Sequence, residues 1–295
     1  MRKTLTEDDE QALQRIAQEA EQRTGKLDLG DLDLTLLPPQ LAELPHLTGL
    51  SVKCPFKSDT LLDLAPLATL TGLQMLFLVG VQFTDLQPLS GLTALRELQL
   101  SRTSVRDLGP LAALSSLDGL ECFDCQLIDW DSLPTLPSLT RLAVWNCRMT
   151  DVSPVTRLAG LRVLMLVADP LRDVGPLAVL GRLEHLDISD TQVFELRPLQ
   201  ALTRLQHLNC SATPATPATD WQSIRPLWEA SSLSTLIACE ERQHHAQAHR
   251  HRRYRRQGKS ALGGQLGAVG SAPLPAPPSP SRSALMWAGR ASPWR

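Results

Sequence analysis

Aromatic residues are scarce in this chain of 295 residues: Phe, Trp and Tyr make up 4%, although hydrophobic residues make up 43%. A core with so few rings must be filled mainly by aliphatic side chains. The sequence contains no run of about 20 apolar residues, the length needed to cross a bilayer. Its opening "MRKTLTEDDEQ" turns acidic at once and lacks the apolar core of a secretory signal. We therefore expect a cytoplasmic protein without membrane contact.

The sequence also lacks the side-chain sets that catalysis and cofactor binding need. We find no nucleophile paired with a general base, no complete set of metal ligands and no intact phosphate-binding loop. These absences predict that the chain is not an enzyme, holds no cofactor or metal, and has no small-molecule substrate.

Leucine is abundant, and it is periodic. Segments with the pattern L-x-x-L-x-L begin every 22 residues, at Leu73, Leu95, Leu117, Leu139, Leu161, Leu183 and Leu205. A fixed period of this length with this motif is the signature of a leucine-rich repeat. One repeat cannot bury its own apolar edge, so neighbouring repeats stack and bury it together.

Each repeat contains two different spacings. In "LRELQLSRTSVRDLGPLAAL" (95–114), the L-x-L part alternates with period 2, which is typical of a half-buried strand. The later leucines, at 108, 111 and 114, step by three, which suits 3₁₀ turns. The pattern predicts an α/β solenoid: a leucine-rich-repeat horseshoe with a concave parallel β-sheet and a 3₁₀ or irregular convex side.

This pattern resembles the bacterial leucine-rich repeats of the internalins and of the repeat arms of bacterial Roco proteins. The resemblance covers residues 24–239. It implies the solenoid fold and leaves the ligand open.

Three regions are expected along the chain. We expect an N-terminal capping helix in residues 1–23, because Thr6 and Asp9 form a capping-box-like start before an apolar stripe. We expect about ten repeats in residues 24–239, with irregular first and last members. Trp221 and Trp228 are expected to cover the apolar edge of the last repeat. Residues 240–295, basic and then rich in Ala, Gly, Pro and Ser, predict a disordered tail.

Charge is divided unevenly between these regions. Residues 1–240 carry 19 Lys or Arg against 30 Asp or Glu, a net charge of −11, and residues 241–295 carry 10 against 1, a net charge of +9. An acidic body argues against nucleic-acid binding by the repeats. The basic tail leaves open a weak contact with nucleic acid or with an acidic surface.

Six cysteines occur, at 54, 122, 125, 147, 210 and 239. The "CFDC" of 122–125 raises zinc as an alternative, but a structural zinc site needs four ligands and only Cys147 is a nearby third. We favour buried, reduced thiols in a cytoplasmic protein. Cys125 and Cys147 are expected to stack in adjacent repeats.

An acidic residue also recurs on the convex side, at Asp63, Asp85, Asp107, Asp129, Asp151, Asp173 and Glu195. Proline follows three residues after most of these positions. A calcium stack is one interpretation, but calcium takes six to eight oxygens and one Asp per repeat does not supply them. We favour Asp as a cap of a helical turn whose opening positions accept proline.

The concave sheet is the expected binding surface for a protein partner. Its candidate contact residues are Phe77, Val79, Gln99, Glu121, Phe123, Arg141, Trp145, Met165, Val167 and Asp187. Exposed apolar clusters with a polar rim mark interaction surfaces, and Trp and Arg are favoured contact residues. The alternative is that these side chains only pack on one another across strands.

Two other functional classes stay open. "GKSALGGQL" (258–266) resembles the end of a Ras-like phosphate-binding loop, the kind of domain that follows the repeats in Roco proteins. Arg253 replaces the first glycine of that loop, so nucleotide binding is not expected. The chain could be the truncated or frameshifted repeat arm of a Roco-like GTPase, or the match could be coincidence. The second class is a bacterial effector that acts on a host protein.

Overall fold

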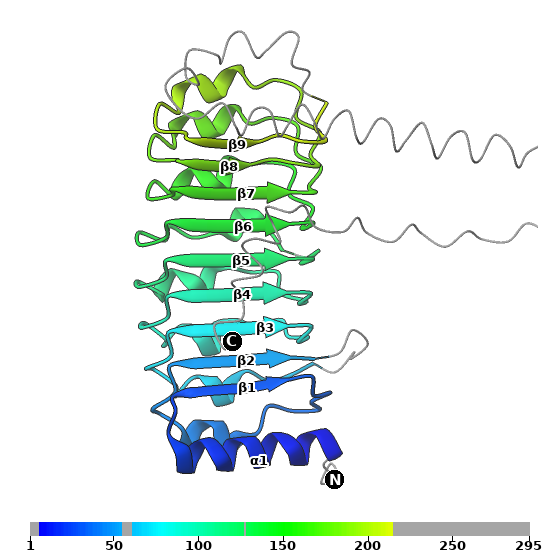
Figure 1. The fold of residues 1–295 in the computed structure, drawn as a ribbon, viewed down its shortest axis with the longest axis vertical. Coiled ribbons are helices and arrows are strands. Elements are labelled where there is room, and N and C mark those ends of the chain that lie inside the picture. The colour runs from blue at the N-terminus through cyan, green and yellow to red at the C-terminus, as the bar shows by residue number, and fades with distance from the viewer. Residues whose placement is uncertain (1–5, 55–60, 127, 215–295) are drawn as a thin grey trace, which may run out of the picture. The chain divides into compact units, whose positions relative to one another are not determined.

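A parallel sheet forms the body of the protein. The structure, a computed structural model, describes residues 6–54, 61–126 and 128–214. Within them, nine strands pair in chain order into one parallel sheet (Figure 1). The strands are β1 (Lys26–Gly30), β2 (Gly49–Lys53), β3 (Met75–Val79), β4 (Glu97–Ser101), β5 (Gly119–Phe123), β6 (Arg141–Trp145), β7 (Val163–Val167), β8 (His185–Asp187) and β9 (His207–Asn209). The predicted leucine-rich-repeat solenoid is confirmed.

The strand register follows the repeat length. Leu98 of β4 pairs with Leu120 of β5, which in turn pairs with Leu142 of β6. Each strand therefore places the same motif position beside the same position of its neighbour. Since side chains alternate between the two faces of a strand, the motif leucines all point to one side of the sheet.

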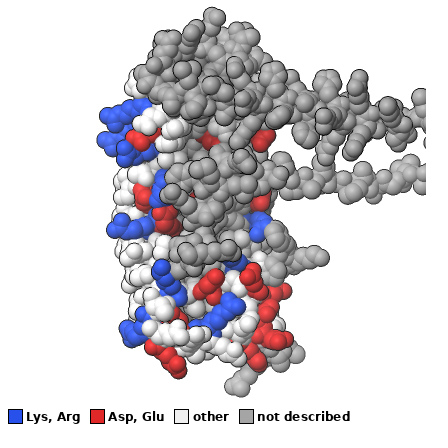
Figure 2. Space-filling model, viewed as in Figure 1, with Lys and Arg blue, Asp and Glu red and all other residues white. Residues whose placement is uncertain are grey.

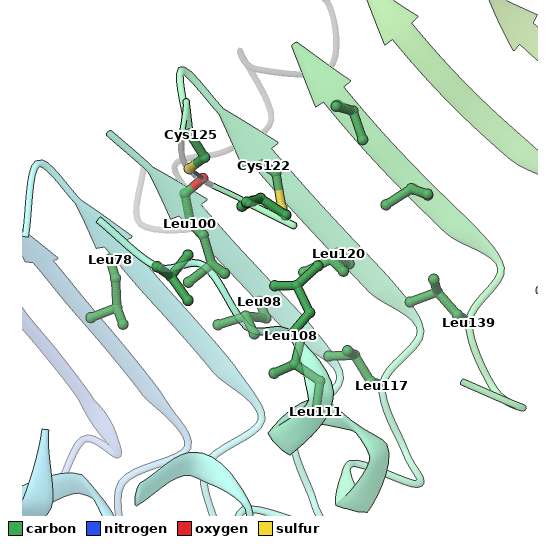
Figure 3. Packing of buried hydrophobic residues seen from close by; sticks show 14 of the residues in the cluster. Leu78, Leu98, Leu100, Leu108, Leu111, Leu117, Leu120, Cys122, Cys125 and Leu139 are labelled. Atoms are coloured by element: carbon green, nitrogen blue, oxygen red, sulfur yellow. Dashed lines mark hydrogen bonds between the residues drawn. The ribbon is translucent and has the colours of Figure 1, made fainter. Parts of the chain in front are cut away.

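Short 3₁₀ turns return the chain from each strand to the next. They are η1 (Pro39–Glu43), η2 (Ala65–Leu67), η3 (Gln87–Leu89), η4 (Gly109–Ala113), η5 (Trp130–Ser132), η6 (Ser153–Arg157), η7 (Gly175–Val179) and η8 (Arg197–Ala201). Figure 3 shows how Leu108 and Leu111 of one return lie opposite Leu98 and Leu120 of the sheet. These side chains belong to one continuous buried core of mainly aliphatic residues.

The aspartates of the convex side accept hydrogen bonds from backbone N–H groups at the start of the 3₁₀ turns. Asp85 accepts a hydrogen bond from the backbone N–H of Gln87 at 2.8 Å, and Asp107, Asp151 and Asp173 do the same two residues ahead. They stand one residue before the N-cap position itself, which Leu86 occupies in η3. Asp129 is itself the N-cap residue of η5. The predicted N-cap role is confirmed for Asp129, whereas the other four aspartates bond the first N–H of the turn from one position before the N-cap.

Helix α1 (Glu7–Gln22) covers the N-terminal edge of the sheet (Figure 1). The predicted capping box is present, with both bonds between Thr6 and Asp9 formed. Asp9 also accepts hydrogen bonds from the N–H and hydroxyl of Thr35, which tie the helix to the first repeat. Burial alone raises the pKa of Asp9, but these bonds to Thr6 and Thr35 hold it below its ordinary value.

Several expectations fall outside the described residues. They concern the repeat boundary at 239, the tryptophans at 221 and 228, the tail 240–295, the segment 258–266 and the cysteine at 239. Among the described residues, no helix is long and apolar enough to cross a membrane.

Candidate protein-binding surface

The open sheet face is the side of the sheet that points away from the leucine core, and it corresponds to the predicted concave face. The first, third and fifth residues of each five-residue strand point to it. In β5 these are Gly119, Glu121 and Phe123, while Leu120 and Cys122 point inward and are fully buried. Because all strands share one register, equivalent positions form rows across the face.

The structure brings the candidate contact residues onto this face but exposes them unequally. Half-buried members are Phe77, Val79, Gln99, Glu121, Phe123, Arg141, Trp145 and Met165. Val167 and Asp187 are only 2% and 6% exposed, so neither offers side-chain surface to a partner. Val167 instead packs beside Trp145 in the same row, since the two residues pair in register.

An aromatic pair lies on the open sheet face at the ends of β5 and β6. Phe123 and Trp145 pair in register on β5 and β6, and their ring centroids lie 6.2 Å apart with an interplanar angle of 78°. This edge-to-face geometry contributes about 1 kcal/mol beyond the burial of the rings. Met165 lies on the next strand, beside Ala143. Apolar side chains that are partly exposed therefore continue from β5 to β7.

A charged cluster lies on the same face, toward the start of the strands. The guanidinium of Arg141 contacts the carboxylates of Glu97 and Asp118, at 2.7 Å for the second. The bond to Glu97 joins β4 to β6 and passes over Gly119 of β5, where a Cβ atom would collide with the Glu97 carboxylate. Burial alone raises the pKa of Asp118, but hydrogen bonds from Thr140 and Arg141 hold it below its ordinary value.

Glu121 lies beside this cluster on the same face. Within the described residues, no hydrogen bond or ion pair involves its carboxylate. Burial raises the pKa of Glu121, and the nearby charge of Glu97 raises it further, while Arg141 opposes the change. Three carboxylates thus gather around Arg141, and Arg96 is a second cation that acts on Asp118. Elsewhere in the view of Figure 2, the described surface shows both signs of charge interspersed with neutral residues.

The C-terminal end of the described face is more polar. The imidazoles of His185 on β8 and His207 on β9 stack with centroids 4.3 Å apart and an interplanar angle of 14°. Burial lowers the pKa of His185, and the charge of a protonated His207 lowers it further. Asn209 donates a 2.9 Å hydrogen bond to Asp187 in the same region. The apolar part of the face therefore ends near β7.

Buried residues that follow the strands form a row from repeat to repeat, the buried row, which includes Cys125 and Cys147. The N–H of Cys125 donates to Cys147 Sγ at 3.3 Å, which confirms that the two residues stack in adjacent repeats. The hydrogen bond with Cys125, together with burial, raises the pKa of the Cys147 thiol. The five described cysteines are free and buried. Among the described residues, no group of three or more His, Cys, Asp or Glu could hold a metal ion.

Asp169 occupies the next position in that row, and it was not among the candidate residues predicted from the sequence. Its Oδ1 accepts the backbone N–H groups of Cys147 at 2.8 Å and Met149 at 3.0 Å, while Oδ2 has no partner. Burial raises the pKa of Asp169 to about 6. The available signal was its position, since Asp169 follows Cys147 by one repeat length.

Two solved structures are similar to this fold. An internalin (inlF) from Listeria monocytogenes has a TM-score of 0.63 and 24% identity, covering 74% of this chain and 66% of its own. Internalin C2 (inlC2) from the same organism has a TM-score of 0.57 and 25% identity, covering 68% of this chain and 92% of its own. The chain thus spans slightly less than two thirds of inlF. No protein-family model and no curated protein matches the sequence. The fold is an internalin-like leucine-rich repeat.

Proposed function

We propose that this chain is a non-catalytic protein-binding scaffold whose partner contacts the open sheet face over β5, β6 and β7. The observation that carries the proposal is the aromatic pair of Phe123 and Trp145, partly exposed on that face, with Met165 on the next strand. Partly exposed apolar clusters rimmed by charge favour protein contacts, and Trp is among the residues that contribute most to binding.

The fold supports a protein-interaction repeat, and the surroundings of the aromatic pair favour binding over chemistry. Catalytic groups act best in an enclosed cavity that excludes water. The open sheet face instead presents a broad row of side chains, as protein partners require. Its charged cluster at Glu97, Asp118 and Arg141 lies toward the start of the strands, on the same face as the apolar side chains, an arrangement that favours specificity for one partner.

We further propose that the protein works in a reducing compartment, in keeping with the cytoplasmic location expected from the sequence. Cys54, Cys122, Cys125, Cys147 and Cys210 are free and buried in the core. Cys125 and Cys147 lie close enough for a backbone N–H of one to reach the sulfur of the other. Stacked thiols of this kind persist unoxidised where cellular reductants keep them so.

The test compares three purified baits. They are the wild-type chain, the double variant Phe123→Asp with Trp145→Asp, and a control that replaces Val179 and Phe194, exposed apolar residues outside the strands, by Asp. A protein captured from the native cell extract is identified, purified and titrated against each bait by calorimetry, with circular dichroism as a check on folding. We expect the wild type and control to bind alike and the double variant to bind about 100-fold more weakly or not at all. Equal dissociation constants for all three folded baits would refute the proposal.

A further inference from the structure

The part of the open sheet face around Glu121 combines unbalanced negative charge with a small neighbour, Ala143, on the β6 side. Arg141 is shared between Glu97 and Asp118, so its charge is already committed to two carboxylates. Among the described residues, no hydrogen bond or ion pair reaches Glu121, although it lies only two residues from Gly119, the position over which Glu97 and Arg141 meet. A half-buried carboxylate without an ion pair of its own is poorly stabilised.

Glu121 has a small neighbour on the β6 side, where Ala143 pairs with it directly. On the other sides, Gln99 pairs with it from β4 and Phe123 follows it in β5. The ion pair of Glu97 and Arg141 occupies the space above Gly119, toward the start of the strands, and the aromatic pair lies toward their ends. Residues directly or diagonally opposite on neighbouring strands are about 5 to 8 Å apart, within reach of one long inserted side chain.

We propose that the partner inserts a lysine or arginine side chain at Glu121, next to an apolar side chain that packs on Phe123 and Trp145. This inference rests on the proposed function, because it names the chemistry of the partner at the same surface. The inserted cation forms the ion pair that Glu121 lacks and also lies near Glu97. Its aliphatic stem crosses Ala143, and its charged end stays at Glu121, between the ion pair and the aromatic pair.

Charge complementarity selects this partner over the alternatives. An acidic segment would meet the three carboxylates of Glu97, Asp118 and Glu121, balanced by Arg141 and, at Asp118, by Arg96. Like charges in contact weaken a complex. A wholly apolar segment would bury the Glu121 carboxylate without a partner, which carries a desolvation penalty. A cation beside Trp145 gains a further attraction to the ring. Arginine fits best, since its planar group can bond a carboxylate with two hydrogens and also stack on a ring.

The experiment uses a display library of random linear 12-residue peptides, selected on the full chain. Parallel selections use Glu121→Gln, the double variant Phe123→Asp with Trp145→Asp, and the control Asp173→Asn on the convex side. We expect wild type and the control to enrich peptides that carry Arg or Lys next to an apolar residue. On Glu121→Gln this preference is lost while apolar residues are still selected. The best peptide should lose about tenfold in affinity for wild type when its cation becomes norleucine, and much less for Glu121→Gln.

The outcomes separate this inference from the proposed function. Peptides that depend on the aromatic pair but show no cation preference, or a preference that survives in Glu121→Gln, overturn the inference and leave the proposed function standing. Failure to find any peptide that distinguishes wild type from the aromatic double variant counts against both. A synthetic peptide of residues 249–259 is titrated as a separate probe. If it binds at Glu121 more tightly than every selected peptide, the occupant is the chain's own basic segment and a separate cationic partner is refuted.

Discussion

Substitution of Asp169 tests how the buried row stabilises the stacking of neighbouring repeats. In the preceding repeat, the Cys147 thiol has one hydrogen to donate, and the carbonyl oxygens of Cys122 and Trp145 lie 3.2 and 3.3 Å from its sulfur. One repeat later, the equivalent carbonyls belong to Val144 and Val167, and Asp169 stands where the thiol stood. An ionised carboxylate has no hydrogen to donate there, which agrees with the unpartnered Oδ2. Replacing Asp169 by Asn keeps the acceptor Oδ1 and puts a donor in place of Oδ2.

The size and sign of the effect follow from the raised pKa. Asp169 has a pKa of about 6 in the folded chain, and an aspartate in the unfolded chain has one of about 4. Between these values the folded state binds more protons than the unfolded state, so stability falls as the pH rises, by about 3 kcal/mol in all. We therefore expect Asp169→Asn to stabilise the protein by about 3 kcal/mol at pH 7.5, and to change stability little near pH 4.

Urea unfolding followed by circular dichroism measures this difference at a series of pH values from 4 to 8. The difference in unfolding free energy between Asp169→Asn and wild type should grow as the pH rises from about 4 to about 7 and then level off. Asp173→Asn serves as the matched control, because Asp173 is exposed and an amide can accept the same bond from Gly175. A difference that is independent of pH, or a variant less stable than wild type throughout, would refute the account of Asp169.

Four further predictions concern the stability of the repeats and of the capping helix. Gly80→Ala should destabilise the protein by about 3 kcal/mol in urea unfolding, because Gly80 has φ +70° and a Cβ atom would lie 2.5 Å from the Cys54 carbonyl. Ala168→Gly should instead stabilise it by about 0.5 kcal/mol in the same assay, because Ala168 has φ 58°; a loss would contradict the reasoning. Asp9→Ala should speed hydrogen exchange throughout α1 several-fold at pH 7, and this excess should shrink as acid protonates Asp9 in wild type. Leu120→Ala should destabilise the protein by about 3 kcal/mol, and an effect below 1 kcal/mol would show that the core is not closely packed there.

Most of the fold could be predicted from the sequence because one spacing determines it. Once Leu95 and Leu117 are known to occupy equivalent positions, the strand register and the inward direction of the motif leucines follow. The stacking of Cys125 on Cys147 was predictable for the same reason. The capping box at Thr6 is a local motif and needs no tertiary information.

The candidate surface was less predictable, since repeat position specifies which face a residue occupies but not how it pairs there. Val167 was expected to be a contact residue of the face, but it is buried beside Trp145. The contact of Arg141 with Glu97 skips a strand and depends on the absence of a side chain at Gly119. Asp169 was missed because a single acidic residue in an inward row gives no motif of its own.

Site-specific photo-crosslinking tests the central claim most directly. A benzoylphenylalanine is placed at Gln99 on the open sheet face or at Val179 in η7, and each full-length protein is irradiated with the purified partner. The account predicts crosslinks from position 99, mapped by mass spectrometry to one segment of the partner, and none above background from position 179. Crosslinking from position 179 alone would contradict it, because the partner would then bind the convex side.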